Sequence, residues 1–99
     1  MAWVYILRCA DSSYYVGSTR GALEVRLWQH STGEGSKYTG SRLPVELVFA
    51  EEYPFVRDAY VREKQLQGWS RRKREALIAD NYATLPQLSK KDFSHRRDD

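Results

Sequence analysis

Three short stretches of the chain combine apolar, aromatic and β-branched residues in the manner of β-strands. They are residues 2–9 (AWVYILRC), residues 14–19 (YYVGST) and residues 45–53 (VELVFAEEY). Stretches of this composition that are bounded by turn-forming residues predict strands. The Ala-Asp-Ser-Ser segment between the first two is a turn signal, so we expect these two strands to form a hairpin.

Three further stretches have the spacing of apolar residues that is typical of helices. The expected helices are residues 22–32, residues 56–69 after Pro54, and residues 71–82 after a capping Ser70. The first of them carries Leu23 and Leu27 four positions apart and ends before Gly33. Ser70, which precedes the third, is a favourable cap because its hydroxyl accepts a hydrogen bond from a backbone N–H of the first turn.

The order of these elements is strand, strand, helix, strand, helix, helix. This order predicts an α+β domain in which a small three-stranded antiparallel sheet is flanked by about three helices. Residues 33–44 form a polar, glycine-rich segment that we expect to be a loop, and loops of this length are often functional. With 99 residues in total, we expect one domain over residues 1–82 and a charged, flexible tail over residues 83–99.

One residue of the second predicted helix departs from its pattern. Val56, Ala59, Tyr60 and Leu66 mark an apolar stripe, and Glu63 lies within that stripe. A buried carboxylate without a partner costs free energy, so such a residue normally reaches solvent, pairs with a base or binds a metal. For Glu63 taken alone, pairing with an arginine is a more common outcome than binding a metal. Only other residues of the chain can favour the metal.

The hairpin determines where two tyrosines point. A three-residue loop is expected to place Cys9 opposite Tyr15, Leu7 opposite Gly17, and Tyr5 opposite Thr19. Tyr5 and Tyr15 would then share one face of the sheet, whereas a loop of two or four residues would place them on opposite faces. Three-residue loops need a residue with positive φ, usually glycine, and here Ser12 or Ser13 must adopt that conformation.

Composition and charge narrow the function classes only moderately. The chain has 16 Lys and Arg against 13 Asp and Glu, for a net charge of +3. Its cations include a run of four over residues 71–74 and further positions at Arg20, Arg26, Lys37 and Arg42. This distribution is compatible with a phosphate-binding surface and equally with ordinary solvated charge.

Simple features of the chain argue against a membrane span, a signal peptide, an internal disulfide and a multi-cysteine zinc site. No stretch approaches the roughly 20 apolar residues that a membrane span requires, and the first residues lack the basic segment of a signal peptide. The single cysteine, Cys9, excludes an internal disulfide and a multi-cysteine zinc site. We therefore expect a cytoplasmic protein that has no membrane partner.

The polar residues of the hairpin, the first helix and the second helix resemble a known family in their order and spacing. Val4-Tyr5-Ile6 and Tyr15-Val16-Gly17 resemble the paired signature of the GIY-YIG nucleases, and Arg26, His30 and Glu63 follow at similar spacing. The likeness covers roughly residues 2–80. The first tripeptide has Val where the family name has Gly, a position that provides backbone context rather than chemistry.

The segment Lys37–Pro44 (KYTGSRLP) adds a second, independent likeness. It resembles the Tyr-Thr, Arg-x-Pro segment of the small stand-alone bacterial members of this family and of their structure-specific endonuclease relatives. Many members also carry an asparagine after the glutamate helix. Asn81 is the candidate for that position in this chain.

The resemblance implies hydrolysis of phosphodiester bonds in DNA, in repair or recombination, with Mg²⁺ (or Mn²⁺) as the cofactor. Glu63 would hold the cation, since Mg²⁺ needs only one or two carboxylates beside waters and phosphate oxygens. Arg26 would bind the scissile phosphate through its guanidinium fork. Tyr5 or Tyr15 would take the proton of the attacking water, and of the two we favour Tyr5. His30 would share or relay that proton.

The resemblance also implies contacts with the substrate, for which branched or nicked DNA is the expected partner. Gly17 would let its strand approach the substrate closely. The other residues expected near DNA are Lys37, Tyr38, Thr39, Arg42, Arg71, Arg72, Lys73 and Arg74.

Two alternatives to a nuclease remain open at this point. One is a nucleic-acid-binding module of the same fold that does not cleave its substrate. The other is an interaction domain that a protein partner targets through an exposed apolar patch around Trp28 or Trp69. The complete set of tyrosines, arginine, histidine and glutamate favours the nuclease over both alternatives.

Overall fold

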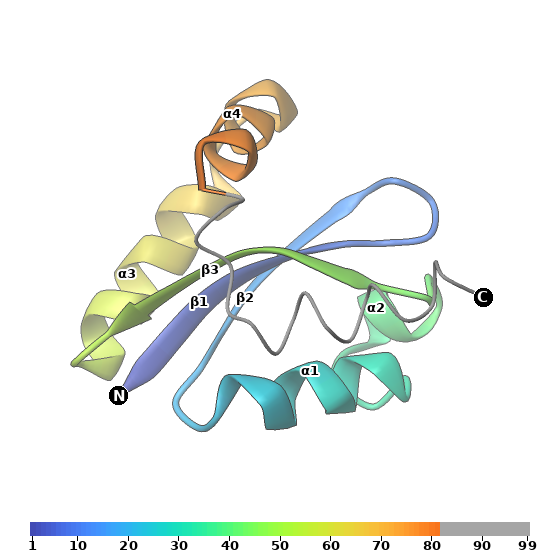
Figure 1. Cartoon of the computed structure of the whole chain (residues 1–99), viewed down its shortest axis with the longest axis horizontal. Coiled ribbons are helices and arrows are strands. Elements are labelled where there is room, and N and C mark those ends of the chain that lie inside the picture. The colour runs from blue at the N-terminus through green and yellow to red at the C-terminus, as the bar shows by residue number, and fades with distance from the viewer. Residues whose placement is uncertain (82–99) are drawn as a thin grey trace.

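Strand β1 (Ala2–Arg8) lies at the centre of a three-stranded antiparallel sheet, between β2 (Tyr14–Thr19) and β3 (Glu46–Tyr53). The computed structural model describes residues 1–81 of the chain. Within that part the predicted α+β class and the antiparallel sheet are confirmed (Figure 1). The predicted boundary at residue 82 and the predicted tail lie outside the described residues.

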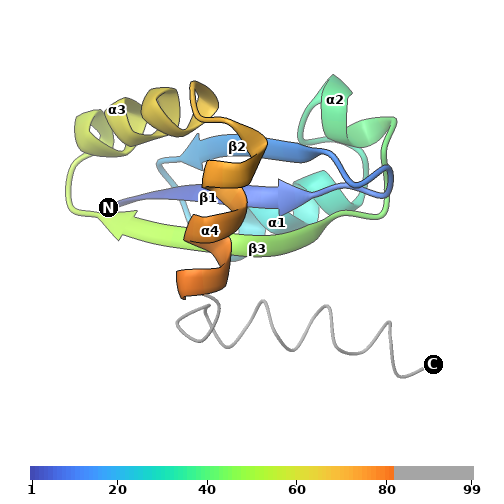
Figure 2. The same ribbon diagram turned by 90° about the horizontal axis from the view of Figure 1, so that it is seen from above.

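The helices cover both faces of the sheet. Helix α1 (Leu23–Ser31) lies on one side, and α3 (Val56–Gln67) and α4 (Arg71–Asn81) lie on the other, so that in Figure 2 α4 crosses in front of the sheet and α1 lies behind it. None of the helices within residues 1–81 is long and apolar enough to cross a membrane.

Each face of the sheet has its own apolar core, because side chains alternate between the two faces along every strand. The core on the α1 side contains Tyr5, Leu7, Cys9, Leu23, Leu27, Val45 and Leu47. The core on the side of α3 and α4 contains Ala2, Val4, Ile6, Val16, Val48, Phe49, Ala59 and Leu66. Strand β1 therefore contributes side chains to both cores.

The segment over residues 33–44 is not the continuous loop that we expected. It contains the short helix α2 (Lys37–Gly40), so the described chain has four helices rather than three. The Ser36 hydroxyl caps this helix by accepting a hydrogen bond from the backbone N–H of Thr39 at 3.1 Å. A helix of a single turn has no apolar periodicity, and this is why the sequence pattern did not reveal it.

The hairpin has the predicted three-residue loop but a different register. Ser12 adopts the positive φ of 70°, and Cys9 pairs with Ser13 through a backbone hydrogen bond of 2.8 Å. The predicted pairs are therefore wrong by two residues, since Tyr5 faces Gly17 and Leu7 faces Tyr15. A shift by two keeps each side chain on its face, so the prediction that Tyr5 and Tyr15 share a face is confirmed.

The predicted apolar stripe of α3 is only partly buried. Ala59 and Leu66 are buried, whereas 41% of Val56 and 54% of Tyr60 are exposed. Val56 and Tyr60 belong to the same stripe, but both border a pocket at the end of β2. Glu63, which lies between the two buried residues, is half-buried.

Candidate active site

A chain of hydrogen bonds passes through the buried residue His30. The inner face of α1 consists of Leu23, Leu27 and His30, so the helix turns the imidazole towards the sheet. The Tyr5 hydroxyl lies 2.8 Å from His30 Nε2, and the Thr39 hydroxyl lies 2.8 Å from His30 Nδ1. Both ring nitrogens of His30 are therefore occupied by hydroxyl groups from other elements.

The segment that leads into α2 is shaped around this histidine. Thr39 is fully buried, and its hydroxyl lies 3.0 Å from the Ser36 hydroxyl. A Cβ atom added to Gly35 would overlap the His30 ring. Thr39, which we expected to contact DNA, thus holds His30 in place. Gly35 and Ser36 could not be singled out from the sequence, because nothing there distinguishes them within a glycine-rich segment.

The electrostatic surroundings of the hydrogen-bonded Tyr5 and His30 favour the neutral form of both side chains. Burial lowers the pKa of His30 to about 4, and the positive charge of Arg26 acts in the same direction. Burial raises the pKa of Tyr5 well above its ordinary value; Tyr15 and Glu63 add to the rise, and Arg26 opposes it. At neutral pH the bond between Tyr5 and His30 therefore joins a phenol to an uncharged imidazole.

The second tyrosine lies beside the first and is more accessible. The Tyr15 ring centroid is 6.5 Å from that of Tyr5 and 5.2 Å from that of His30. Only 1% of Tyr5 is exposed, whereas Tyr15 is half-buried. A Cβ atom on Gly17 would lie 2.6 Å from the Tyr5 hydroxyl oxygen and 2.9 Å from the Tyr15 ring, so Gly17 makes room for both rings.

Arg26 lies one helical turn before His30 and carries an unused hydrogen-bond donor. Its Nε is buried and has no hydrogen-bond partner among residues 1–81. Arg26 also lines a pocket of about 180 Å³ together with Ser18 and Thr19 of β2 and Tyr60 of α3. A buried guanidinium donor without a partner is costly, and an anion bound beside it would supply the missing acceptor.

Glu63 reaches the same edge of the sheet from the opposite face. Its carboxylate accepts a hydrogen bond of 2.6 Å from the Ser18 hydroxyl and one of 2.8 Å from the Gln67 side-chain amide. None of the three ion pairs found within residues 1–81 includes Glu63. The alternative in which an arginine neutralises this carboxylate is therefore not what the described part of the chain shows.

The donor set around Glu63 suits one particular kind of metal ion. No group of three or more His, Cys, Asp and Glu residues gathers within residues 1–81, so this part of the chain forms no cage of protein ligands. Mg²⁺ is commonly held by one or two carboxylates and completes its shell with waters and phosphate oxygens. Each oxygen of Glu63 accepts one hydrogen bond from an uncharged donor, which leaves lone pairs for a cation. The residues present fit such an ion.

Tyr38 and Arg42 extend the aromatic group beyond Tyr15. The Tyr38 ring centroid lies 6.0 Å from that of Tyr15, and the Arg42 guanidinium carbon lies 3.8 Å from the Tyr38 ring centroid. Arg42 also forms an ion pair of 3.0 Å with Asp11. Part of the positive charge of Arg42 is thus neutralised within the protein, while Tyr38 remains 37% exposed.

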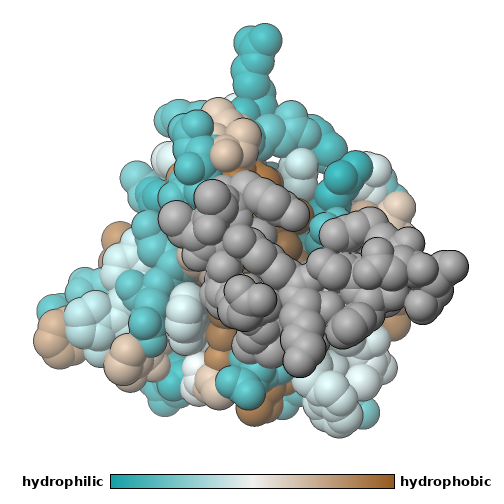
Figure 3. Space-filling model, viewed as in Figure 1, coloured by the Kyte–Doolittle hydropathy of each residue, from teal (hydrophilic) through white to brown (hydrophobic). Residues whose placement is uncertain are grey.

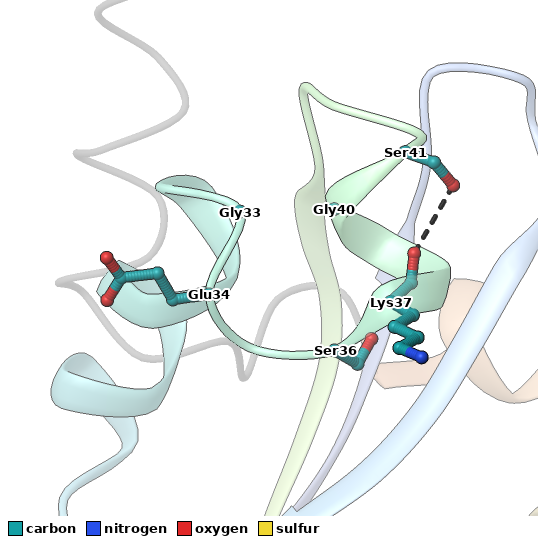
Figure 4. Close-up of a pocket in the computed structure, with 6 residues that line it drawn as sticks. All are labelled: Gly33, Glu34, Ser36, Lys37, Gly40 and Ser41. Carbon is teal, nitrogen blue, oxygen red and sulfur yellow. Dashed lines mark hydrogen bonds between the residues drawn. The ribbon is translucent and has the colours of Figure 1, made fainter.

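A larger hollow beside α2 does not gather reactive groups. It measures about 560 Å³ and is lined by Gly33, Glu34, Ser36, Lys37, Gly40 and Ser41. Figure 4 shows that Glu34 points away from Lys37 and that the Ser41 hydroxyl bonds the Lys37 carbonyl. None of Tyr5, Arg26 and Glu63 lines this hollow, although Lys37 is exposed at the start of α2.

The basic run at the start of α4 is partly structural. The Arg74 guanidinium donates hydrogen bonds to the carbonyls of Leu66 and Gln67 and so caps α3. Arg71 donates to the Ser12 carbonyl at 2.7 Å. Arg72 and Lys73 are exposed, and the Lys73 ammonium lies 4.6 Å from the Trp69 ring centroid.

The remaining candidates, Asn81 and the two tryptophans considered for a partner surface, lie elsewhere. The Asn81 amide donates to the Leu77 carbonyl of its own helix, which packs against β3, whereas Glu63 bonds to a residue of β2 at the other edge of the sheet. Of the two tryptophans, Trp28 is 63% exposed and Trp69 is half-buried. Asn81 is thus not brought to the group around Glu63.

Comparison with known proteins places this geometry in a family. Residues 1–76 match the GIY-YIG catalytic domain. A UPF0213 protein of Natronomonas pharaonis is 45% identical over 78 residues, which are 79% of this chain and 91% of the relative. A UPF0213 protein of Bacillus pumilus is 40% identical over 78 residues, 79% of each chain.

A solved structure agrees with these matches. The solution NMR structure of a UPF0213 protein from Bacillus halodurans is 37% identical and superimposes with a TM-score of 0.55. The match covers 83% of this chain and 87% of that one. The chain therefore belongs to the GIY-YIG nuclease family, in the small single-domain group that includes the UPF0213 proteins.

Proposed function

We propose that this protein is a Mg²⁺-dependent endonuclease that hydrolyses phosphodiester bonds in DNA, acting on branched or nicked DNA during repair or recombination in the cytoplasm. One observation carries the proposal. The buried Nε of Arg26 has no partner within residues 1–81, and both Arg26 and Glu63 lie close enough to Tyr5 for their charges to shift its pKa. A cation to neutralise the phosphate, a carboxylate to hold a metal and a tyrosine to accept a proton, gathered around one strand edge, suit phosphodiester hydrolysis.

Arg26 is the group that binds the scissile phosphate in this proposal. A guanidinium offers parallel N–H donors that match two phosphate oxygens, and its charge stabilises the negative charge that develops during attack. The neighbouring Tyr5, His30 and Thr39 side chains are joined by hydrogen bonds of 2.8 Å. They hold this part of the site rigid and keep it free of further charge.

Tyr15 replaces Tyr5 as the proposed acceptor of the proton from the attacking water. A base must touch the water that it activates, and Tyr5 is almost fully enclosed and hydrogen-bonded to His30. Burial also raises the pKa of Tyr5, which opposes loss of its proton. Tyr15 lies against the same His30 and is half-buried, so it can meet both solvent and substrate.

Glu63 is the residue that would hold Mg²⁺. Bound there, the ion would act as a Lewis acid on the phosphate oxygens and as a template for the substrate. Ser18 and Gln67 fix the orientation of the carboxylate through the hydrogen bonds described above. Ligand orientation by such outer partners is a regular feature of metal sites.

The proposal is tested by replacing Arg26 with Gln and following the nicking of supercoiled DNA with Mg²⁺ present. We expect the rate at saturating DNA to fall by about 100-fold or more, because loss of one donor to a transition-state oxygen costs roughly that much. Arg57→Gln, an exposed arginine on α3, is the matched control and should nick at the parent rate. A parental rate in Arg26→Gln would contradict the proposal.

A further inference from the structure

The pocket beside Arg26 has two chemically different walls. One wall is largely apolar and consists of Ala2, Val56, Ala59 and Tyr60. The other wall is polar and includes Ser18, Arg20 and Arg26. Ser18 is also the residue whose hydroxyl bonds Glu63 at 2.6 Å, so the pocket adjoins the carboxylate assigned to the metal.

Two residues of the apolar wall, Val56 and Tyr60, are exposed to solvent. Tyr60 is 54% exposed and Val56 is 41% exposed, although the same helix buries Ala59 and Leu66. Phe55, which precedes Val56, is 64% exposed. Figure 3 shows brown and tan residues at the left edge of the molecule, where Figure 1 places the first turn of α3 and the N-terminus.

We propose that this pocket binds one unpaired nucleobase of the nucleotide that adjoins the scissile phosphate; the proposal rests on the function proposed above. An aromatic side chain stacks on the face of any base, which makes Tyr60 a platform that tolerates different sequences. Arg20 and Arg26, which also line the pocket, complement the phosphates on either side of that base.

The size of the pocket limits the occupant to a small planar group. Pockets that enclose drug-sized molecules typically measure about 300–1,000 Å³, and this one measures about 180 Å³. A single base is compatible with that space, whereas a base pair or the apolar face of a partner helix is not. The positive charge of two arginines in so small a pocket also favours a nucleotide over an apolar peptide side chain.

The subsite selects a class of substrate. A base can enter the pocket only after it has left the duplex stack, and this costs free energy in a fully paired duplex. The cost is smallest where a nucleotide is already unpaired. The protein should therefore prefer DNA with an unpaired nucleotide at the cleavage position over continuous duplex DNA.

The test measures binding without metal, so that no cleavage is needed to read it. Two labelled duplexes are compared in the presence of a chelator, one with a single bulged nucleotide and one with an abasic residue in place of that nucleotide. The parent protein should bind the bulged base about ten-fold more tightly, in line with the contribution of one stacked base. Tyr60→Ala should lose this preference, and Tyr60→Phe, which keeps the ring, should retain it.

The control and the outcomes separate the two proposals. Trp28→Ala removes another exposed aromatic residue, from α1, and should leave the preference unchanged. Equal affinity of the parent for both duplexes, or a preference that survives in Tyr60→Ala, would overturn the subsite. If the parent protein discriminates the two duplexes but nicks no DNA with Mg²⁺, the base-binding pocket stands and the nuclease proposal is refuted. If it nicks DNA without discriminating the duplexes, the nuclease proposal stands and the base-binding pocket is refuted.

Discussion

At the scale of single residues, the site is organised by His30, whose ring nitrogens are both engaged. Tyr5 and Thr39 occupy them at 2.8 Å each, and burial with the nearby Arg26 keeps the ring uncharged. The sequence indicated His30 as a candidate site residue. Its partner Thr39 was expected to contact DNA instead of the histidine. Spacing along α1 could show that His30 faces inward, yet it could not show which residue of a distant segment would meet the ring.

The lowered pKa of His30 predicts a specific dependence of stability on pH. The pKa is about 4 in the folded protein and about 6.5 in an unfolded chain. Between these values the unfolded chain binds a proton that the folded protein does not, so the free energy of unfolding should fall as the pH falls from 6.5 to 4. Denaturant unfolding at several pH values measures this slope.

The matched variant for this experiment is His30→Gln, which cannot titrate. Hydrogen bonds from Ser13 lower the pKa of Asp11, and this carboxyl is present in both proteins. The difference between the two curves therefore isolates His30. Parallel curves between pH 4 and pH 6.5 would show that His30 gains a proton equally well in the folded protein.

At the scale of elements, strand β2 is what joins the two halves of the site. Its side chains alternate, so Tyr15 and Gly17 face α1 while Ser18 faces α3 and meets Glu63. The strands and longer helices were predictable within a residue or two because their patterns are periodic. The register and α2 were not, because they depend on the turn conformation of Ser12 and on the cap formed by Ser36.

The space around Gly17 and Gly21 predicts different effects of a substitution to alanine at the two positions. A methyl group at Gly17 would lie 2.6 Å from the Tyr5 hydroxyl oxygen, whereas one at Gly21 has its nearest neighbour at 4.0 Å. Gly17→Ala should therefore lower the free energy of unfolding by on the order of 1–3 kcal/mol through overpacking. Gly21→Ala should change it by less than about 0.5 kcal/mol.

Urea denaturation of the two variants checks this prediction, and nicking of DNA gives a second readout. Because Tyr5 and Tyr15 both adjoin Gly17, Gly17→Ala should also slow cleavage, while Gly21→Ala should not. Equal stability of the two variants would mean that Tyr5 does not occupy the space above Gly17.

At the scale of the whole molecule, helices from opposite faces of the sheet deliver Arg26 and Glu63 to one edge. The sequence indicated both residues by their order, and it indicated Glu63 by its place among apolar residues. It could not show that the carboxylate would bond Ser18 and Gln67, since those contacts depend on how α3 crosses β2. It also could not separate the cations of α4 that cap α3 from those that remain exposed.

That separation predicts how DNA binding responds to salt. Each phosphate that the protein neutralises contributes about 0.9 to the slope of log affinity against log salt concentration. Replacing the exposed Arg72 and Lys73 with Gln should lower the slope by about 2 without affecting stability. Arg74→Gln should instead lower the stability and leave the salt slope unchanged, because the Arg74 guanidinium caps α3 through two carbonyls. Affinity titrations at several salt concentrations, together with thermal melts, give both quantities, and an unchanged slope in the double variant would place DNA on another surface.

The most direct test of the whole account is the rate of Mg²⁺-dependent nicking in Glu63→Gln. The amide can still accept from Ser18 or Gln67, so the fold should persist, but it lacks the charge that would hold the ion. We expect the rate to fall by about 100-fold or more, because metal catalysis contributes several kcal/mol. Glu52→Gln, an exposed glutamate on β3, should nick at the parent rate. A folded Glu63→Gln protein that nicks DNA at the parent rate in Mg²⁺ would contradict the account.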